Sequence, residues 1–161
     1  MKRLHMLLLL ALKLTTRSFR KNKIESTDQL IGTWRLIELS DFDSSISTWI
    51  HPFGKNPIGF FTYTKSGIVN LNISTDTPLK ISADSAKDYK VNLLDWVSHH
   101  SVGYFGTYTV DLNKSILTHH VKGGSLPWYN ETDQPRPFIL KGDILIIGDN
   151  KTWRRVLLKA D

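Results

Sequence analysis

The chain has 161 residues, of which 40% are hydrophobic and 22% are charged, and these proportions predict one globular domain rather than a disordered chain. It contains no cysteine, which excludes disulfide scaffolds, thiolate zinc sites and cysteine nucleophiles. Its formal net charge of +6 raises the question of a nucleic-acid partner.

The positive charge is concentrated at the N-terminus. Residues 1–24 contain seven Lys and Arg and no acid, whereas the rest of the chain holds 14 Lys and Arg against 15 Asp and Glu. A nucleic-acid-binding domain needs basic groups on its folded surface. We therefore expect no nucleic-acid partner, and expect any membrane contact to involve only residues 1–24.

This N-terminal segment leaves several interpretations open. Lys2 and Arg3 precede the apolar run 6–12, as in a signal peptide, but Lys13 closes the run and no small-x-small cleavage site follows. The same composition suits an organelle presequence, a helix lying on anionic lipid, or an ordinary tail. The run is too short to span a bilayer. We favour a cytoplasmic location over a secreted or organellar one.

From residue 30 onward, short segments alternate between apolar and polar residues and are separated by turn residues. This spacing is typical of an all-β sandwich or barrel, and we predict an antiparallel up-and-down barrel of about nine strands. A basic arm would occupy residues 1–28 and the barrel domain residues 29–161. The predicted strands are 33–39, 47–51, 58–64, 68–74, 102–110, 115–122, 138–140, 144–147 and 152–158.

One segment, residues 82–97, departs from the strand pattern. Ser82 or Asp84 could cap the start of a helix there. One amphipathic helix among strands suits a plug or lid packed on a barrel. The residues at helical spacing are Ala86, Tyr89, Leu93 and Val97.

Alternation along the strands predicts which side chains face the barrel interior. Val69, Leu71 and Ile73 share one face, and Phe61 and Tyr63 should face the same interior from the partner strand. These residues form the first part of the expected core.

The same rule separates the two adjacent histidines. Leu117 and Val121 carry His119 inward, which leaves His120 outside. His119 is then either a hydrogen-bonded core residue or a polar group on a cavity wall. In the strand 152–158 the pattern alone leaves the inward face open.

Four motifs occur in this order along the chain: Leu30-Ile31-Gly32-Thr33-Trp34-Arg35-Leu36, His51-Pro52-Phe53-Gly54-Lys55-Asn56-Pro57-Ile58-Gly59, Tyr63-Thr64-Lys65-Ser66-Gly67 and Thr118-His119-His120-Val121. Together they resemble the lipocalin-like domain family over roughly residues 30–158. The resemblance implies a barrel with a ligand-sized cavity. In lipocalins the Gly-x-Trp indole crosses the closed floor of the barrel under an arginine from the end of the chain, which implies such roles for Trp34 and Arg155. Gly123 and Gly124 depart from the family pattern at the cavity rim.

The residues that could hold a metal or perform catalysis show no suitable spacing. The six histidines form no His-x-His or His-x3-His pair and have no acid at ligand spacing, so we expect no metal and no other cofactor. Glu38 follows Trp34 and Leu36 on the same predicted face. If it points inward it needs a partner, and we expect an ion pair with Arg155 at the barrel floor.

We predict that the barrel binds a small hydrophobic or amphipathic molecule, with Trp128 near the cavity mouth. One alternative is an enzyme for cyclisation or isomerisation, in which His119 or Tyr63 moves a proton. Another is a filled barrel that contacts proteins, which would lack a cavity of about 300 Å³ or more. No residue is assigned as catalytic, and the oligomeric state stays open. The predicted ligand-binding residues are His119, Tyr63, Tyr108, Trp128, Phe61 and Phe138, and the floor residues are Trp34, Arg155 and Glu38.

Overall fold

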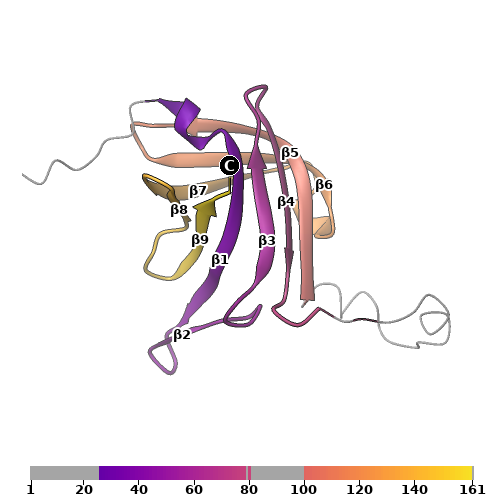
Figure 1. Cartoon of the computed structure of the whole chain (residues 1–161), viewed down its shortest axis with the longest axis vertical. Helices are drawn as coiled ribbons and strands as arrows, with labels where there is room; N and C mark the ends of the chain where they lie inside the picture. Colours follow the sequence, from indigo (N-terminus) through magenta and orange to yellow (C-terminus); the bar gives the residue numbers. More distant parts are fainter. Residues whose placement is uncertain (1–25, 79, 81–99, 161) are drawn as a thin grey trace, which may run out of the picture.

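A computed structural model describes residues 26–78, 80 and 100–160. In this part of the chain, eight antiparallel strands close into a barrel and a short ninth strand lies outside it (Figure 1). The predicted N-terminal arm to residue 25 and the whole of the predicted helix at 82–97 lie outside the described residues. The strands are β1 (Gly32–Asp43), β2 (Thr48–Ile50), β3 (Ile58–Tyr63), β4 (Ile68–Ser74), β5 (Ser101–Asp111), β6 (Ile116–Gly124), β7 (Thr132–Lys141), β8 (Ile144–Ile147) and β9 (Trp153–Lys159).

The barrel closes because β1 pairs with one strand on each of its two edges, β3 and β9. Its first residues pair with β3, and the stretch from Trp34 to Asp41 pairs with β9. Strand β2 pairs only with the end of β1, at Asp41–Asp43, and so stays outside the ring. The predicted barrel and the predicted number of strands are therefore confirmed.

Strand β7 begins six residues earlier than predicted. Pro135 and Pro137 lie inside it, although proline lacks the N–H that a central strand uses for pairing. In the described structure β8 pairs with β7 only from Phe138 to Lys141. Both prolines therefore lie in the half of β7 that has one neighbouring strand, β6, where a missing N–H is tolerated.

A bulge in β1 reverses the expected direction of Glu38. The pairing with β9 shifts at Ile37, so Leu36 is opposite Leu157 but Glu38 is opposite Val156. One extra residue turns the following side chains to the other face of a strand. The expectation that Glu38 shares the inward face with Leu36 is wrong, because Glu38 lies outside and Leu39 takes the inward position.

One end of the barrel is closed by a short 3-10 helix, η1 (Thr27–Leu30) (Figure 1). Leu30 and Trp34 have no exposed surface, and the Trp34 indole donates a hydrogen bond of 2.9 Å to the carbonyl of Leu30. The ammonium of Lys159 lies 4.5 Å from the Trp34 ring. The cation over this indole is thus Lys159 and not Arg155 as expected, because Trp34 pairs with Lys159 in the β1–β9 register.

The core fills the barrel with the alternating inward residues of all eight strands. The buried apolar side chains form one cluster of Leu30, Trp34, Leu36, Leu39, Phe53, Phe61, Tyr63, Val69, Leu71, Ile73, Tyr104, Leu117, Val121, Phe138, Leu140, Leu145, Ile147 and Leu157.

Among the described residues, none forms a helix long and apolar enough to cross a membrane.

Candidate functional site

A cavity occupies the half of the barrel away from η1. Its volume is about 140 Å³, close to the roughly 150 Å³ of a cavity that can hold one benzene molecule. This is less than the about 300 Å³ expected of a ligand-sized pocket. The described barrel is therefore largely filled, as the filled-barrel alternative predicts, with room for one small ring or short chain. The cavity is lined by Leu39, Phe53, Phe61, Leu71, Ile73, Val102, Tyr104, Leu126, Tyr129, Arg136, Ile147 and Arg155.

The cavity wall is apolar except for two tyrosines and two arginines. Strand β5 contributes Tyr104, strand β7 Arg136 and strand β9 Arg155, each from the inward face of its strand. Tyr129 comes from the short 3-10 helix η2 (Pro127–Tyr129), which joins β6 to β7. The polar groups thus come from strands or turns that are separate in sequence and meet only in the closed barrel.

Next to the cavity, His119 is held between two tyrosine hydroxyls. Its Nε2 lies 3.0 Å from the Tyr63 hydroxyl and its Nδ1 lies 2.7 Å from the Tyr104 hydroxyl. A neutral imidazole has one N–H and one acceptor nitrogen, so one tyrosine donates to the ring and the other accepts from it. The polar atoms of this buried histidine are therefore both satisfied.

All three of these groups are uncharged at neutral pH. Burial, aided by the nearby Arg136 cation, lowers the pKa of His119 to about 3. Burial also raises the pKa of Tyr104 and raises the pKa of Tyr63 well above its ordinary value. His119, Tyr63 and Tyr104 therefore form a neutral network that carries no charge into the cavity.

Arg136 is the least compensated charge near the cavity. Its guanidinium lies between two aromatic rings, 5.8 Å from the centre of Tyr129 and 5.7 Å from that of Trp153. Its Nε is buried and has no hydrogen-bond partner among the described residues. Burial opposes its charge, but the neighbouring Tyr104 and Tyr129 hydroxyls outweigh that effect and keep the pKa of Arg136 above its ordinary value. Arg136 is therefore a cation.

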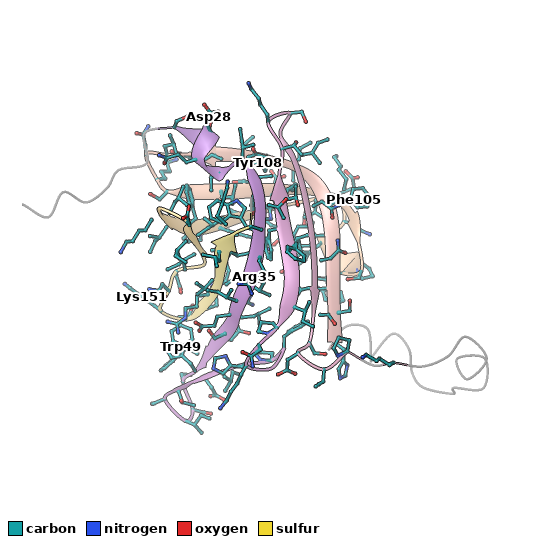
Figure 2. All side chains as sticks on the ribbon, in the orientation of Figure 1. Asp28, Arg35, Trp49, Phe105, Tyr108 and Lys151 are labelled. Carbon is teal, nitrogen blue, oxygen red and sulfur yellow. The ribbon has the colours of Figure 1, made fainter. Side chains whose placement is uncertain are left out.

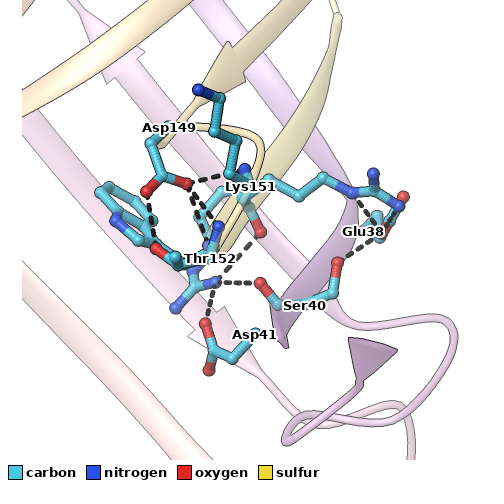
Figure 3. Close-up of polar contacts among 9 residues, drawn as sticks. Glu38, Ser40, Asp41, Asp149, Lys151 and Thr152 are labelled. Carbon is cyan, nitrogen blue, oxygen red and sulfur yellow. Dashed lines mark hydrogen bonds and ion pairs between the residues drawn. The ribbon is translucent and has the colours of Figure 1, made fainter. Parts of the chain in front are cut away.

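Arg155, by contrast, has an acidic partner. One terminal nitrogen donates to the carboxylate of Asp41 at 2.8 Å and to the backbone carbonyl of Ser40 at 2.9 Å (Figure 3). Its guanidinium also lies 5.5 Å from the centre of the Trp153 ring. Asp41 therefore balances the charge of Arg155 at the cavity wall.

The expected Glu38–Arg155 ion pair is wrong. Glu38 pairs instead with Arg154, at 2.7 Å, and also accepts a hydrogen bond from Ser40 (Figure 3). Arg154 and Arg155 point to opposite faces of β9, and the bulge at Ile37 moves Glu38 to the outer face. Glu38 is thus not a floor residue of the barrel.

The turn before β9 places Trp153 and Arg155. The carboxylate of Asp149 accepts hydrogen bonds from the backbone N–H groups of Lys151, Thr152 and Trp153 and from the Thr152 hydroxyl (Figure 3). These bonds lower the pKa of Asp149 below its ordinary value. The charged carboxylate therefore fixes the point at which β9 begins.

Of the six predicted ligand-binding residues, only Phe61 lines the cavity. His119, Tyr63 and Phe138 are buried beside it, and Tyr104 alone carries the His119 network to the cavity wall. Tyr108 lies near the closed end, at the same end as Asp28, and donates to the carbonyl of Thr64 (Figure 2). Trp128 is exposed in η2, next to the cavity residue Tyr129.

The expected directions of the two adjacent histidines are confirmed. His119 has no exposed surface. The His120 side chain lies outside, with its Nδ1 2.6 Å from the carboxylate of Asp133 and its Nε2 3.0 Å from the Thr109 hydroxyl. Within the described ranges, no group of three or more His, Asp and Glu residues could hold a metal ion.

Sequence reasoning missed Arg136, Tyr104 and Tyr129 as polar residues of the cavity. Alternation backwards from the buried Phe138 would have placed Arg136 inward, but the predicted strand began only at residue 138. Tyr104 follows the inward alternation of β5, but alternation alone does not distinguish a residue of the cavity wall from a core residue. Tyr129 lies in a turn, where period-2 alternation makes no prediction.

Comparison with protein families agrees with this architecture. A family model described as a lipocalin-like domain matches residues 31–158. No curated protein sequence matches the chain.

Proposed function

The chain belongs to the lipocalin-like domain family, and we propose that its barrel binds a small, largely apolar molecule in the cavity away from η1. The observation that carries this proposal is the cavity itself, walled by apolar side chains with a few polar groups on one side. That combination is typical of small-molecule sites, in which burial supplies affinity and polar groups supply orientation.

The cavity volume limits the size of the ligand and its affinity. Burying one aromatic ring removes about 150 Å² of apolar surface from water, which is worth about 4 kcal/mol at about 25 cal/mol per Å². That free energy corresponds to a Kd of about 1 mM. A neutral molecule with one ring should therefore bind weakly but measurably, and tighter binding needs polar contacts.

The alternative of proton-transfer catalysis by His119 has less support. A general base works best when its pKa lies near the working pH. The pKa of His119 is lowered to about 3 by burial, and tyrosine hydroxyls occupy both of its ring nitrogens. His119 therefore has neither the basicity nor a free nitrogen for a substrate proton, which favours binding over catalysis.

Two matched variants on β5 test whether the cavity is the binding site. Val102 and Val110 are both half-buried on the inward face of this strand, but only Val102 lines the cavity. We expect V102W to abolish benzamide binding, because the larger ring fills the cavity, and V110W to retain it. NMR titrations with benzamide measure both, with thermal melts as a check of folding.

Equal loss of benzamide binding in both variants, or no binding to the wild-type protein, would contradict the proposal. Native mass spectrometry of protein purified from its own host then identifies the natural ligand by mass. If the co-purified ligand still binds to V102W but not to V110W, the binding site lies at the η1 end of the barrel and the proposed cavity is not the site.

A further inference from the structure

We propose that the cavity is selective for a small apolar carboxylic acid, and that Arg136 is the residue that binds its carboxylate. This inference rests on the proposed binding function and specifies its ligand class. It goes beyond apolar burial because it predicts discrimination between ligands of the same shape and different charge.

The first observation is that Arg136 sits at the cavity without an acidic partner. Among the residues that the structure describes, no Asp or Glu forms an ion pair with it, and its buried Nε has no acceptor. Taking a guanidinium out of water is costly unless it is paired, and arginine cannot escape this cost by losing its proton. A carboxylate in the cavity would supply both the missing charge and the missing acceptor.

The second observation is that the neighbouring groups supply no negative charge to Arg136. The Tyr104 and Tyr129 hydroxyls raise the pKa of Arg136 and so favour its charged form, but Tyr104 is itself neutral because burial raises its pKa. The carboxylate of Asp41 already forms an ion pair with the other arginine of the cavity, Arg155, at 2.8 Å. The cavity therefore presents one more positive charge than negative, which favours an anion over a neutral ligand.

The third observation is the arrangement of rings around the guanidinium. Tyr129 and Trp153 lie at 5.8 and 5.7 Å from its central carbon and hold it at the cavity wall. An arginine held in one place loses little freedom when it binds, and its planar fork matches the two oxygens of a carboxylate. The opposite wall is apolar, with Leu71 and Ile73, and suits the hydrocarbon part of the acid.

The size of the cavity restricts the acid to one ring or a short chain. A volume of about 140 Å³ excludes a long fatty acid from lying wholly inside the described barrel. Benzoate is therefore a suitable probe. Benzamide and benzamidine have nearly the same shape but are neutral and cationic, so a comparison of the three isolates the effect of charge.

The test measures the affinity of these three compounds for the full-length protein by NMR titration. We expect benzoate to bind about ten- to a hundredfold more tightly than benzamide, the usual gain from a charge-assisted hydrogen bond. Benzamidine should bind more weakly than benzamide, because its cation faces Arg136. Phenyl phosphate serves as a fourth compound, since tighter binding of phenyl phosphate than of benzoate would overturn the choice of a carboxylate.

Two variants assign the effect to one residue. R136M should reduce benzoate affinity to that of benzamide and leave benzamide within about threefold of the wild type. Arg35 lies exposed on β1, so R35M makes the same substitution outside the cavity and should leave both affinities unchanged. If R136M does not fold, R136K keeps the charge but loses the fork, and should bind benzoate with intermediate affinity.

The outcomes separate this inference from the proposed function. If benzoate and benzamide bind equally to the wild-type protein, or if R136M and R136K bind benzoate as the wild type does, the anion site is wrong but the binding function stands. If none of the compounds binds, both proposals fail.

Discussion

Lowering the pH should reduce the free energy of unfolding of this protein through His119, at pH values above those at which ordinary carboxylates take up protons. Burial lowers the pKa of His119 from 6.5 to about 3. In the unfolded chain this histidine takes up a proton as the pH falls through about 6.5, whereas in the folded protein it stays neutral until about pH 3. Its contribution to stability is therefore full above pH 6.5 and is lost progressively between pH 6.5 and 3.

The size of the effect follows from the difference between the two pKa values. Each pH unit below 6.5 costs up to 1.36 kcal/mol, so a fall from about pH 7 to about pH 5 should lower the free energy of unfolding by about 2 kcal/mol. Ordinary carboxylates have pKa values near 4 and contribute little above pH 5. This window therefore reports mainly on histidine.

Urea unfolding curves at about pH 7, 6 and 5, followed by tryptophan fluorescence, measure this loss. H119Q is the informative variant, because glutamine can still donate to one tyrosine and accept from the other but does not titrate. H120Q is its matched control on the outer face of β6, where the side chain pairs with Asp133.

We expect the wild-type protein and H120Q to lose about 2 kcal/mol between pH 7 and 5, and H119Q to lose much less. The reasoning would be refuted if the wild-type stability were constant over this range, or if H119Q lost as much as the wild type. Either result would mean that His119 accepts a proton inside the barrel.

Three further substitutions test the architecture by equilibrium unfolding. W34A should lose about 3–5 kcal/mol, because it empties the closed end of the barrel, and a loss below about 1 kcal/mol would contradict that role. E38A should cost about 1 kcal/mol or less, because its ion pair with Arg154 is partly exposed on the outer face; a larger cost would point to a buried acid. G106A should cost about 1–3 kcal/mol or more, since an added Cβ would lie 2.0 Å from the backbone oxygen of His120, and a neutral effect would rule out such close strand packing.

The sequence by itself determined the barrel and much of its interior. Period-2 alternation around Leu117 and Val121 was enough to place His119 inside and His120 outside, because successive side chains of a strand point to opposite faces. The same rule placed Tyr63 and Phe61 in the core. These directions depend on local geometry, which the order of residues along one strand contains.

Tertiary structure decided the partners and the site. The bulge at Ile37 depends on the pairing of β1 with β9, which are far apart in sequence, and it moved Glu38 outside. The register of the same two strands placed Lys159 over Trp34. The cavity exists only because eight strands close into a ring and bring side chains from opposite walls together. A pattern along one strand carries no information about what faces it across the barrel, so only the closed structure shows that no acid of the described residues pairs with Arg136.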